Sequence, residues 1–226
     1  MNLFKSGFKA MLPIITGVIP FGAVMGTVCS EAKLSLFQAV SMNVFVFAGA
    51  AQLATVELMT KHAATLVIVA TGLIINLRFL LYSAALSPLV QRSSFFIKFI
   101  SAYFLTDQSY AIMMANQHKL KTNEDAVQFY LGSCVCMALT WHLSVVAGFI
   151  FGNFAPSSWA LDYAVPLSFI ALAIPTFKNY KYVITAIFSG CIALLLNPMP
   201  YKTGLIATAA LSILLATLLT QKKGVK

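Results

Sequence analysis

The sequence LPIITGVIPFGAVMG, residues 12–26, decides how the rest of the chain is interpreted. It is apolar enough for a lipid bilayer, yet it contains five residues that weaken a helix: Pro13, Gly17, Pro20, Gly22 and Gly26. Proline lacks an amide donor and crowds the preceding turn, so carbonyls one turn earlier lose their helical partners. Irregular backbone at membrane depth persists only where it is buried in protein or lines a cavity. The stretch therefore predicts a first span broken at Gly17–Gly22, with the break as a candidate substrate site. A proline-containing helix repaired by its neighbours is the alternative.

The composition is that of a polytopic membrane protein. Of the 226 residues, 60% are hydrophobic and only 9% are charged, and the mean hydropathy is +0.87. Because one span needs about 20 apolar residues, seven or eight crossings would use up nearly the whole chain. The composition thus predicts an all-α transmembrane helical bundle that forms a single domain over residues 1–226.

Short polar connections divide the chain into eight expected spans, which lie near residues 8–30, 35–58, 63–88, 95–116, 126–151, 160–177, 181–198 and 201–220. This division puts ten lysines and arginines on the side of both termini and four on the other side. Positive charge marks the cytoplasmic side, so both termini are predicted to be cytoplasmic. A seven-span chain with one re-entrant apolar run is the alternative, and it fits the charges less well. The net charge of +9 orients the chain in the bilayer on this interpretation, and nucleic acid is not expected as a partner.

Signatures of enzymes and metal sites are missing from the sequence. The four cysteines lie in or beside apolar runs, and neither Cys-x-x-Cys nor a Cys/His ligand spacing occurs. There is no His-Glu-x-x-His, no Gly-x-Ser-x-Gly and no phosphate-binding glycine-rich loop with lysine. We therefore expect no catalysis, no metal and no cofactor.

Small residues are concentrated in the second expected span, in FAGAAQLA, residues 47–54. Small side chains let membrane helices approach closely, so helix packing is one explanation and contact with a ligand at Gly49 is the other. Gln52 is harder to explain by packing, because a membrane-buried amide must satisfy several hydrogen bonds. Ala48 to Ala51 are expected to form the floor of a pocket, beside Phe47.

An arginine lies inside the third expected span, in TGLIINLRFLLYSAALSP, residues 71–88. Its guanidinium cannot lose its charge, and burying it in lipid costs about 2.5–3.5 kcal/mol on insertion scales, so it should face a partner or a wet cavity. Tyr82 lies one turn further along the same face as Arg78, and Asn76 lies nearby. The alternative is that Arg78 extends to the membrane surface. If it is interior, Arg78 is suited to bind a carboxylate.

An aspartate lies near the middle of the fourth expected span, in FISAYFLTDQSYAIMM, residues 99–114. Paired with Arg78, Asp107 would lower the joint cost of burial and could separate from it when a zwitterion arrives; protonated, it could carry a coupling proton. A static ion pair that locks two helices is the alternative. Thr106 and Gln108 are expected to face elsewhere, as helical neighbours.

Two further features are less specific. Pro166 and Pro175 in the sixth expected span echo the proline pair of the first, as happens where two halves of a transporter meet. His142 is either a proton relay or a packing histidine.

Five segments taken in order resemble the AzlC family of branched-chain amino-acid permeases: GVIPFGAVMG (17–26), FAGAAQLA (47–54), NLRFLLYSAALSP (76–88), FLTDQSYA (104–111) and LDYAVPLSF (161–169). The resemblance implies efflux of branched-chain amino acids across a bacterial inner membrane, together with a small AzlD-type membrane protein as second subunit. The chain departs from the family pattern at Gln108, where the family often has Glu, and at Phe79, where it often has His. An acid and a titratable ring are thereby missing, which leaves Asp107 as the principal interior acid.

The leading hypothesis is a proton-coupled exporter of a hydrophobic amino acid. Arg78 would bind the carboxylate, and Asp107 would face the ammonium and couple transport to protons. The substrate site is assigned to Gly17, Pro20, Phe21, Gly22, Gly49, Gln52, Asn76, Arg78 and Tyr82. The alternative is a non-transporting subunit of a larger complex, in which Arg78 and Asp107 only hold helices together.

Overall fold

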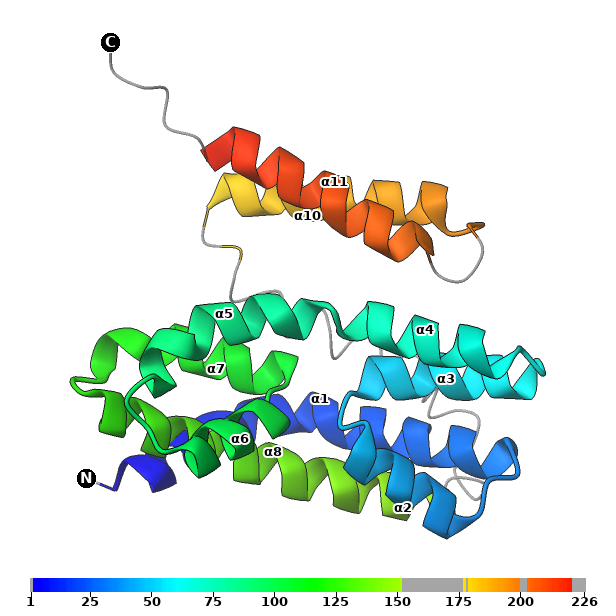
Figure 1. Cartoon of the computed structure of the whole chain (residues 1–226), viewed down its shortest axis with the longest axis horizontal. Helices are drawn as coiled ribbons and strands as arrows, with labels where there is room; N and C mark the ends of the chain where they lie inside the picture. Colours follow the sequence, from blue (N-terminus) through cyan, green and yellow to red (C-terminus); the bar gives the residue numbers. More distant parts are fainter. Residues whose placement is uncertain (1, 152–176, 178, 200–202, 221–226) are drawn as a thin grey trace. The chain divides into compact units, whose positions relative to one another are not determined.

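The computed structural model describes residues 2–151, 177, 179–199 and 203–220. It divides into two compact units, residues 1–172 and 173–226. The described residues form helices without a β-strand (Figure 1). The first unit contains α1 (Leu3–Glu31), α2 (Leu36–Phe45), α3 (Gly49–Thr60), α4 (Thr65–Asn76), α5 (Arg78–Val90), α6 (Phe95–Tyr103), α7 (Asp107–Asn116), the short 3₁₀-helix η1 (Gln117–Lys119) and α8 (Asn123–Phe151). The second contains α10 (Tyr180–Leu196) and α11 (Thr203–Thr220). The prediction of an all-helical membrane bundle is confirmed.

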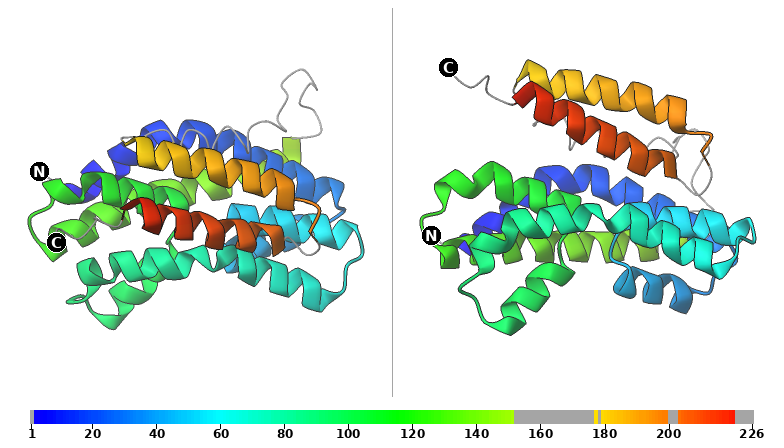
Figure 2. Two further views of the ribbon diagram at one scale, coloured as in Figure 1. Left: turned by 90° about the horizontal axis from the view of Figure 1, so that it is seen from above. Right: turned by 45° about the horizontal axis from the view of Figure 1, so that its top comes forward.

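Among the residues that the structure describes, three helical segments are long and apolar enough to cross a bilayer: α1, α4 together with α5, and α8. Helices α1 and α8 run parallel and in contact, because Gly7 meets Phe129 near their first turns and Gly22 meets Ser144 further along (Figures 1 and 2). Glycines at these contacts bring the two backbones together, which is how membrane helices gain dispersion energy without a hydrophobic driving force. This pair is the scaffold on which the rest of the first unit is built.

Two helical hairpins fill the space beside this scaffold. Helix α2 starts from the end where α1 finishes, the chain turns at residues 46–48, and α3 returns to that end (Figures 1 and 2). Helices α6 and α7 form the same arrangement from the opposite end, with the turn at residues 104–106. Each half has 9 to 12 residues, or about 15 Å at 1.5 Å per residue, which is half of a hydrocarbon core of about 30 Å. The tips of both hairpins therefore meet near mid-depth.

The hairpins correct two predicted spans, 35–58 and 95–116. Both segments have the length and hydrophobicity of one crossing, but each folds back on itself and ends on the side where it began. Hydropathy depends on how many apolar residues a segment has and not on whether its path reverses. The sequence pattern therefore could not distinguish one full crossing from a re-entrant hairpin. The seven-span alternative allowed one re-entrant run, whereas the first unit contains two.

The predicted break in the first span is wrong. Helix α1 is continuous from Leu3 to Glu31 and contains both Pro13 and Pro20. The hydroxyl of Thr16 donates to the carbonyl of Pro13 at 2.8 Å, a bond between a side chain and the backbone within the same turn. Gly22 and Gly26 in the same helix pack closely against α8. The interrupted backbone lies instead at the two hairpin tips and at Leu77, between α4 and α5.

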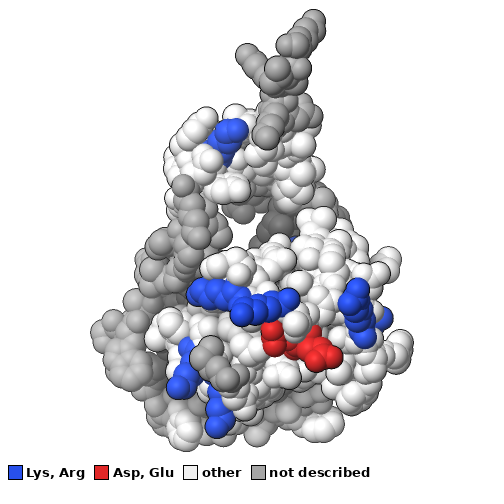
Figure 3. Space-filling view, turned by 90° about the vertical axis from the view of Figure 1, so that its left-hand side faces the viewer, with Lys and Arg blue, Asp and Glu red and all other residues white. Residues whose placement is uncertain are grey.

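Basic residues gather at one end of the first unit, which we name the basic end. Here α1 and α8 begin, α5 is followed by α6, and α7 is followed by α8 (Figure 3). The six residues are Lys5, Lys9, Arg92, Lys98, Lys119 and Lys121, whereas the opposite end has Lys33 and Lys61. For the same eight residues, the eight-span division put five on the side of the N-terminus and three on the other side. The two re-entrant hairpins therefore make the charge difference between the two ends larger.

The second unit is an antiparallel helical hairpin of α10 and α11 (Figure 1). Gly204 packs against the backbone of Leu196, and the buried Thr208 donates its hydroxyl to the carbonyl of Gly204 at 2.7 Å. These helices occupy the seventh and eighth expected spans. The sixth expected span, with Asp162, Pro166 and Pro175, lies outside the described residues apart from position 177.

Candidate substrate site where the interrupted helices meet

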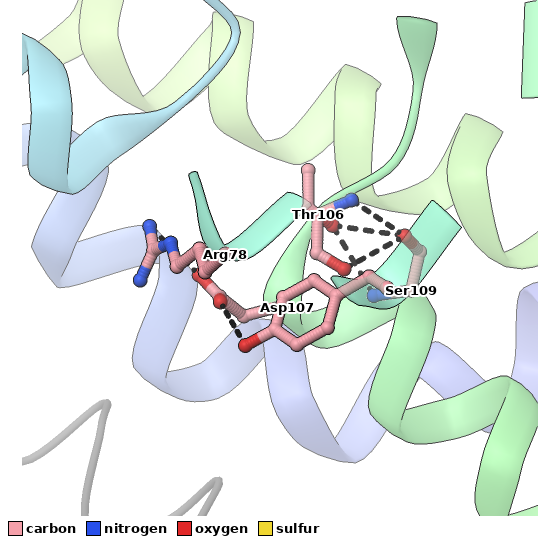
Figure 4. Close-up of polar contacts among 5 residues, drawn as sticks. Arg78, Thr106, Asp107 and Ser109 are labelled. Carbon is pink, nitrogen blue, oxygen red and sulfur yellow. Dashed lines mark hydrogen bonds and ion pairs between the residues drawn. The ribbon is translucent and has the colours of Figure 1, made fainter. Parts of the chain in front are cut away.

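An ion pair joins the first residues of two helices. Arg78 begins α5 and Asp107 begins α7, and Nη2 of the arginine lies 3.1 Å from Oδ2 of the aspartate (Figure 4). The hydroxyl of Tyr82 donates to Oδ1 at 3.0 Å. The side chains of Arg78 and Asp107 are 26% and 13% exposed, so the ion pair is largely buried within the protein. The structure thus brings together the two charged residues and the tyrosine that were assigned to one site.

The arginine retains hydrogen-bonding capacity. Its Nε is buried and has no partner among the described residues, and the guanidinium lies 5.3 Å from the centre of the Phe79 ring. A guanidinium offers five N–H donors in a planar fork that suits a carboxylate. Arg78 can therefore bind a second carboxylate while it keeps at least part of its contact with Asp107 or Phe79.

The start of α7 stabilises the aspartate. Thr106 caps the helix: its Oγ1 accepts from the amide of Ser109 at 3.2 Å, and Oγ of Ser109 accepts from the amide of Thr106 at 2.9 Å (Figure 4). A negative side chain in the first turn interacts favourably with the helix dipole. Thr106 and Gln108 both line the same cavity as Asp107, so the prediction that they face elsewhere is wrong. The reason is that Thr106 is the cap before the helix and does not follow helical spacing.

The start of α3 has no such cap. Ala48 precedes the helix without a side-chain hydrogen bond, and the first helical bond runs from the amide of Gln52 to the carbonyl of Ala48 at 2.9 Å. The amides of Gly49, Ala50 and Ala51 have no acceptor within the described chain. Free amides and the positive end of the dipole together make a helix start attractive to anions.

Gly49 is required by a close approach. A Cβ atom at this position would lie 2.5 Å from Cη2 of Trp141 on α8. The indole cannot move aside easily, because its Nε1 donates to Oδ1 of Asn43 and its ring packs edge-on against Phe21 at 5.1 Å. The glycine thus lets the start of α3 reach the centre of the molecule.

These helix starts surround a central cavity of about 20 Å³. Its walls are Phe21, Phe47, Ala48, Gly49, Ala50, Arg78, Phe79, Thr106, Asp107, Gln108, Met137 and Trp141. This volume is enough for about one water molecule. An amino acid would fit only after the walls separate.

The residues assigned to the site from the sequence fall into three groups. Phe21, Gly49, Arg78 and Asp107 line the central cavity, and Tyr82 is bonded to Asp107. Gln52 and Asn76 lie beside it: Nε2 of Gln52 donates to Asn43 at 3.1 Å across the α2–α3 tip, and Asn76 lines a neighbouring groove. Gly17 and Pro20 belong to the continuous α1, and Gly22 packs against Ser144 outside the cavity.

Sequence reasoning missed Thr106, Gln108, Met137 and Trp141 as cavity residues. The spacing of Thr106 and Ser109, typical of a helix cap, was a usable signal for a helix start at Asp107. No local pattern marks Met137 or Trp141, since they reach the cavity only through the pairing of α8 with α1. His142 stacks on Phe47 at 5.5 Å, and its Nδ1 lies 2.8 Å from the carbonyl of Ala138, which fits the packing role.

On the hypothesis that the site exports amino acids, we expect Tyr82→Phe to weaken transport about tenfold. The variant removes the hydroxyl bonded to Asp107, and a hydrogen bond to a charged group contributes about 1.5–3 kcal/mol, while the stack of Tyr82 on Tyr110 at 4.3 Å is kept. Initial rates of amino-acid flux in reconstituted vesicles measure the effect. Tyr110→Phe is the matched control, because the described residues offer its hydroxyl no hydrogen bond. Equal rates for both variants and the wild type would mean that the hydroxyl of Tyr82 does not contribute to transport.

Within the described residues, no three His, Cys, Asp or Glu side chains are grouped closely enough to hold a metal ion. The four cysteines are free thiols, three of them buried.

Comparison with known proteins agrees with the architecture. The family described as AzlC protein matches residues 13–155. An uncharacterized membrane protein of Archaeoglobus fulgidus is 26% identical over 223 residues, covering 95% of this chain and 94% of its own length. Uncharacterized membrane proteins of two Helicobacter pylori strains are 23% and 21% identical, covering 86% and 79% of this chain and 86% and 78% of their own lengths. No solved structure matches significantly. Because the family match spans most of the chain, including every helix around the central cavity, the protein belongs to the AzlC family.

Proposed function

We propose that this membrane protein is a secondary transporter that exports branched-chain or other hydrophobic amino acids. One observation carries the proposal: the Arg78–Asp107 ion pair lies beside the uncapped start of α3, inside a cavity where three helices begin. Transporters commonly bind their substrates near mid-depth at interrupted helices of this kind. The family match supports a membrane role related to transport.

A zwitterion complements this arrangement in charge and in chemistry. Its carboxylate is bound by Arg78 and by the free amides of Gly49 to Ala51, while its ammonium is bound by Asp107. Separating a buried ion pair is costly because each charge is left without a partner. An amino acid supplies both partners at once, so the net charge of the site is unchanged when it binds. A ligand with a single charge does not have this advantage.

The remaining walls favour an apolar side chain. Phe21, Phe47, Phe79, Met137 and Trp141 line the central cavity with hydrophobic surface. Burial of such surface contributes about 25 cal/mol per Å², and a charged side chain would lose its hydration there. The polar wall residues outside the ion pair are Thr106 and Gln108. The hydrophobic walls select aliphatic substrates, in agreement with the resemblance to branched-chain amino-acid permeases.

The energy source, orientation and partner are parts of the same proposal. The basic end faces the cytoplasm of a bacterial inner membrane by the positive-inside rule, which places the N-terminus inside. The lysines at positions 222, 223 and 226 place the C-terminus on the same side by the same rule. Asp107 couples export to the proton gradient, and a small AzlD-type membrane protein serves as second subunit, as the family resemblance implies.

Flux of labelled leucine and valine in proteoliposomes tests the function. We expect saturable transport that responds to an imposed pH gradient, for the protein alone or together with its small partner. Glutamate and lysine are the control substrates, and empty liposomes give the background. Leucine flux that equals the background in both preparations would contradict the proposal.

One observation favours the second candidate, a non-transporting subunit. The ion pair is already complete with Tyr82, and the central cavity of about 20 Å³ holds no amino acid in this state. In that case the pair only fastens α5 to α7, and exchanging the two charges, Arg78→Asp with Asp107→Arg, would leave the activity of the complex intact.

A further inference from the structure

A second, larger cavity lies between α5, α6, α7 and α8. Its volume is about 290 Å³, at the lower end of the range for small-molecule sites. Among its lining residues are Ser83, Leu86, Lys98, Ser101, Leu105 and Tyr130, none of which lines the central cavity. The central site described above does not account for this space.

The larger cavity leads from the basic end toward the ion pair. Gln91 and Lys98 are exposed lining residues at the ends of α5 and α6 that meet at the basic end. At the other extreme lie Ser83, the neighbour of Tyr82, and Leu105, which precedes the cap residue Thr106. In the sequence, these lining residues are therefore next to Tyr82, which bonds Asp107, and to Thr106, which caps the helix that Asp107 begins.

A buried hydroxyl in this cavity lacks a partner. Ser101 is 6% exposed, and its Oγ makes no hydrogen bond with any described residue. Its carbonyl, in contrast, accepts from the hydroxyl of Tyr130 at 2.9 Å. Leaving a buried hydroxyl unsatisfied costs about 1–3 kcal/mol, so such groups in membrane proteins usually bond to water or to a ligand. Ser101 therefore places a hydroxyl that lacks a partner among the described residues in the wall of this cavity.

We propose that this cavity is a second binding site for aliphatic amino acids, a vestibule occupied before the substrate reaches the ion pair. The inference rests on the proposed transport function. Lys98 attracts the carboxylate at the mouth, Ser101 bonds a polar group of the amino acid, and Leu86 and Met113 contact the aliphatic side chain. Leu105, which precedes the cap residue Thr106, forms the inner end of the vestibule.

Cysteine modification tests whether the vestibule is wet and binds substrate. Ser101→Cys is introduced into the full chain after its four native cysteines are replaced by serine or alanine, and the protein is placed in lipid nanodiscs. We expect a positively charged methanethiosulfonate to modify this cysteine, and saturating leucine to slow the reaction at least about fivefold, whereas glutamate does not. Modification only by a neutral lipophilic maleimide indicates a cavity filled by lipid, and modification without protection by leucine indicates water alone. Either result overturns the proposal.

A second variant keeps the native cysteines. Ser101→Ala removes an unsatisfied hydroxyl and is therefore expected to fold, while the KM for leucine export rises about tenfold, the equivalent of one hydrogen bond to a charged group. Thr71→Val is the matched control: Thr71 also has a buried hydroxyl without a partner in the described chain, but it lines neither cavity. An unchanged KM in Ser101→Ala would contradict the proposed second binding site, while continued export would leave the transport function standing. Protection of Ser101→Cys by leucine without any flux contradicts the transport function and leaves the binding site standing.

Discussion

Asp107→Asn is expected to abolish proton-driven export while the protein still inserts and folds. Asparagine has almost the same shape and can still accept a hydrogen bond from Tyr82, but it has no negative charge for Arg78 or for the substrate ammonium. It also cannot take up and release a proton. A lost charge-assisted contact alone lowers transport about 10- to 100-fold, and loss of coupling removes the dependence on the pH gradient.

The measurement is leucine efflux from vesicles with and without an imposed pH gradient. The amount of folded protein, determined by size-exclusion chromatography in detergent, separates loss of function from loss of fold. Arg78→Asp combined with Asp107→Arg restores an ion pair with reversed polarity, which should support folding but not export, because the start of α3 then faces the wrong end of the zwitterion. Undiminished export by Asp107→Asn or by the exchanged pair would favour the structural role of these charges.

Gly26→Leu should have the largest effect on stability. A Cβ atom at Gly26 would overlap the carbonyl oxygen of Val145 and the amide of Phe149 in α8, and backbone atoms cannot turn away as side chains do. Overpacking a tight contact commonly costs about 1–3 kcal/mol, and separating the α1–α8 scaffold adds the loss of contacts along both helices. We expect the midpoint of thermal denaturation in detergent to fall by about 10 °C or more.

The chain offers a matched control for this substitution. Gly190 also lies within a helix, α10, but a Cβ atom there would meet no atom within 4 Å. Gly190→Leu should therefore leave the denaturation temperature nearly unchanged. A similar loss in both variants would mean that glycine-to-leucine exchange in a helix, rather than the α1–α8 contact, determines the stability.

The Arg78–Asp107 ion pair could be predicted from the sequence because a charged side chain inside a membrane has few acceptable environments. An arginine and an aspartate, each inside an apolar run, have few acceptable environments, and pairing with one another is the simplest. The sequence analysis therefore identified Arg78, Asp107 and Tyr82 as one group, and the structure places them within hydrogen-bonding distance. Gly49 was found by a separate argument: small residues are needed wherever a backbone approaches another helix closely.

The path of the chain could not be predicted in the same way. An apolar segment of about 20 residues satisfies the bilayer as one crossing or as two half-length helices, and its hydropathy is identical in both cases. Pro20 suggested a break in α1, but a single proline removes one backbone hydrogen bond, and α1 stays continuous in its close contact with α8. The true interruptions at residues 46–48 and 104–106 contain no proline or glycine, so they depend on tertiary contacts such as the bond from Tyr103 to the carbonyl of Val44.

The two hairpin tips also bear on how the membrane keeps its ion gradients. Helices α3 and α7 begin at the same central cavity, so both present the positive end of a backbone dipole there. Asp107 is already matched by Arg78, and half-helix starts of this kind repel inorganic cations in membrane pores. Sodium and potassium ions therefore meet an electrostatic barrier at the central cavity. With the transport function proposed above, this barrier keeps the ion gradients of the cell from leaking through the protein while no amino acid is bound.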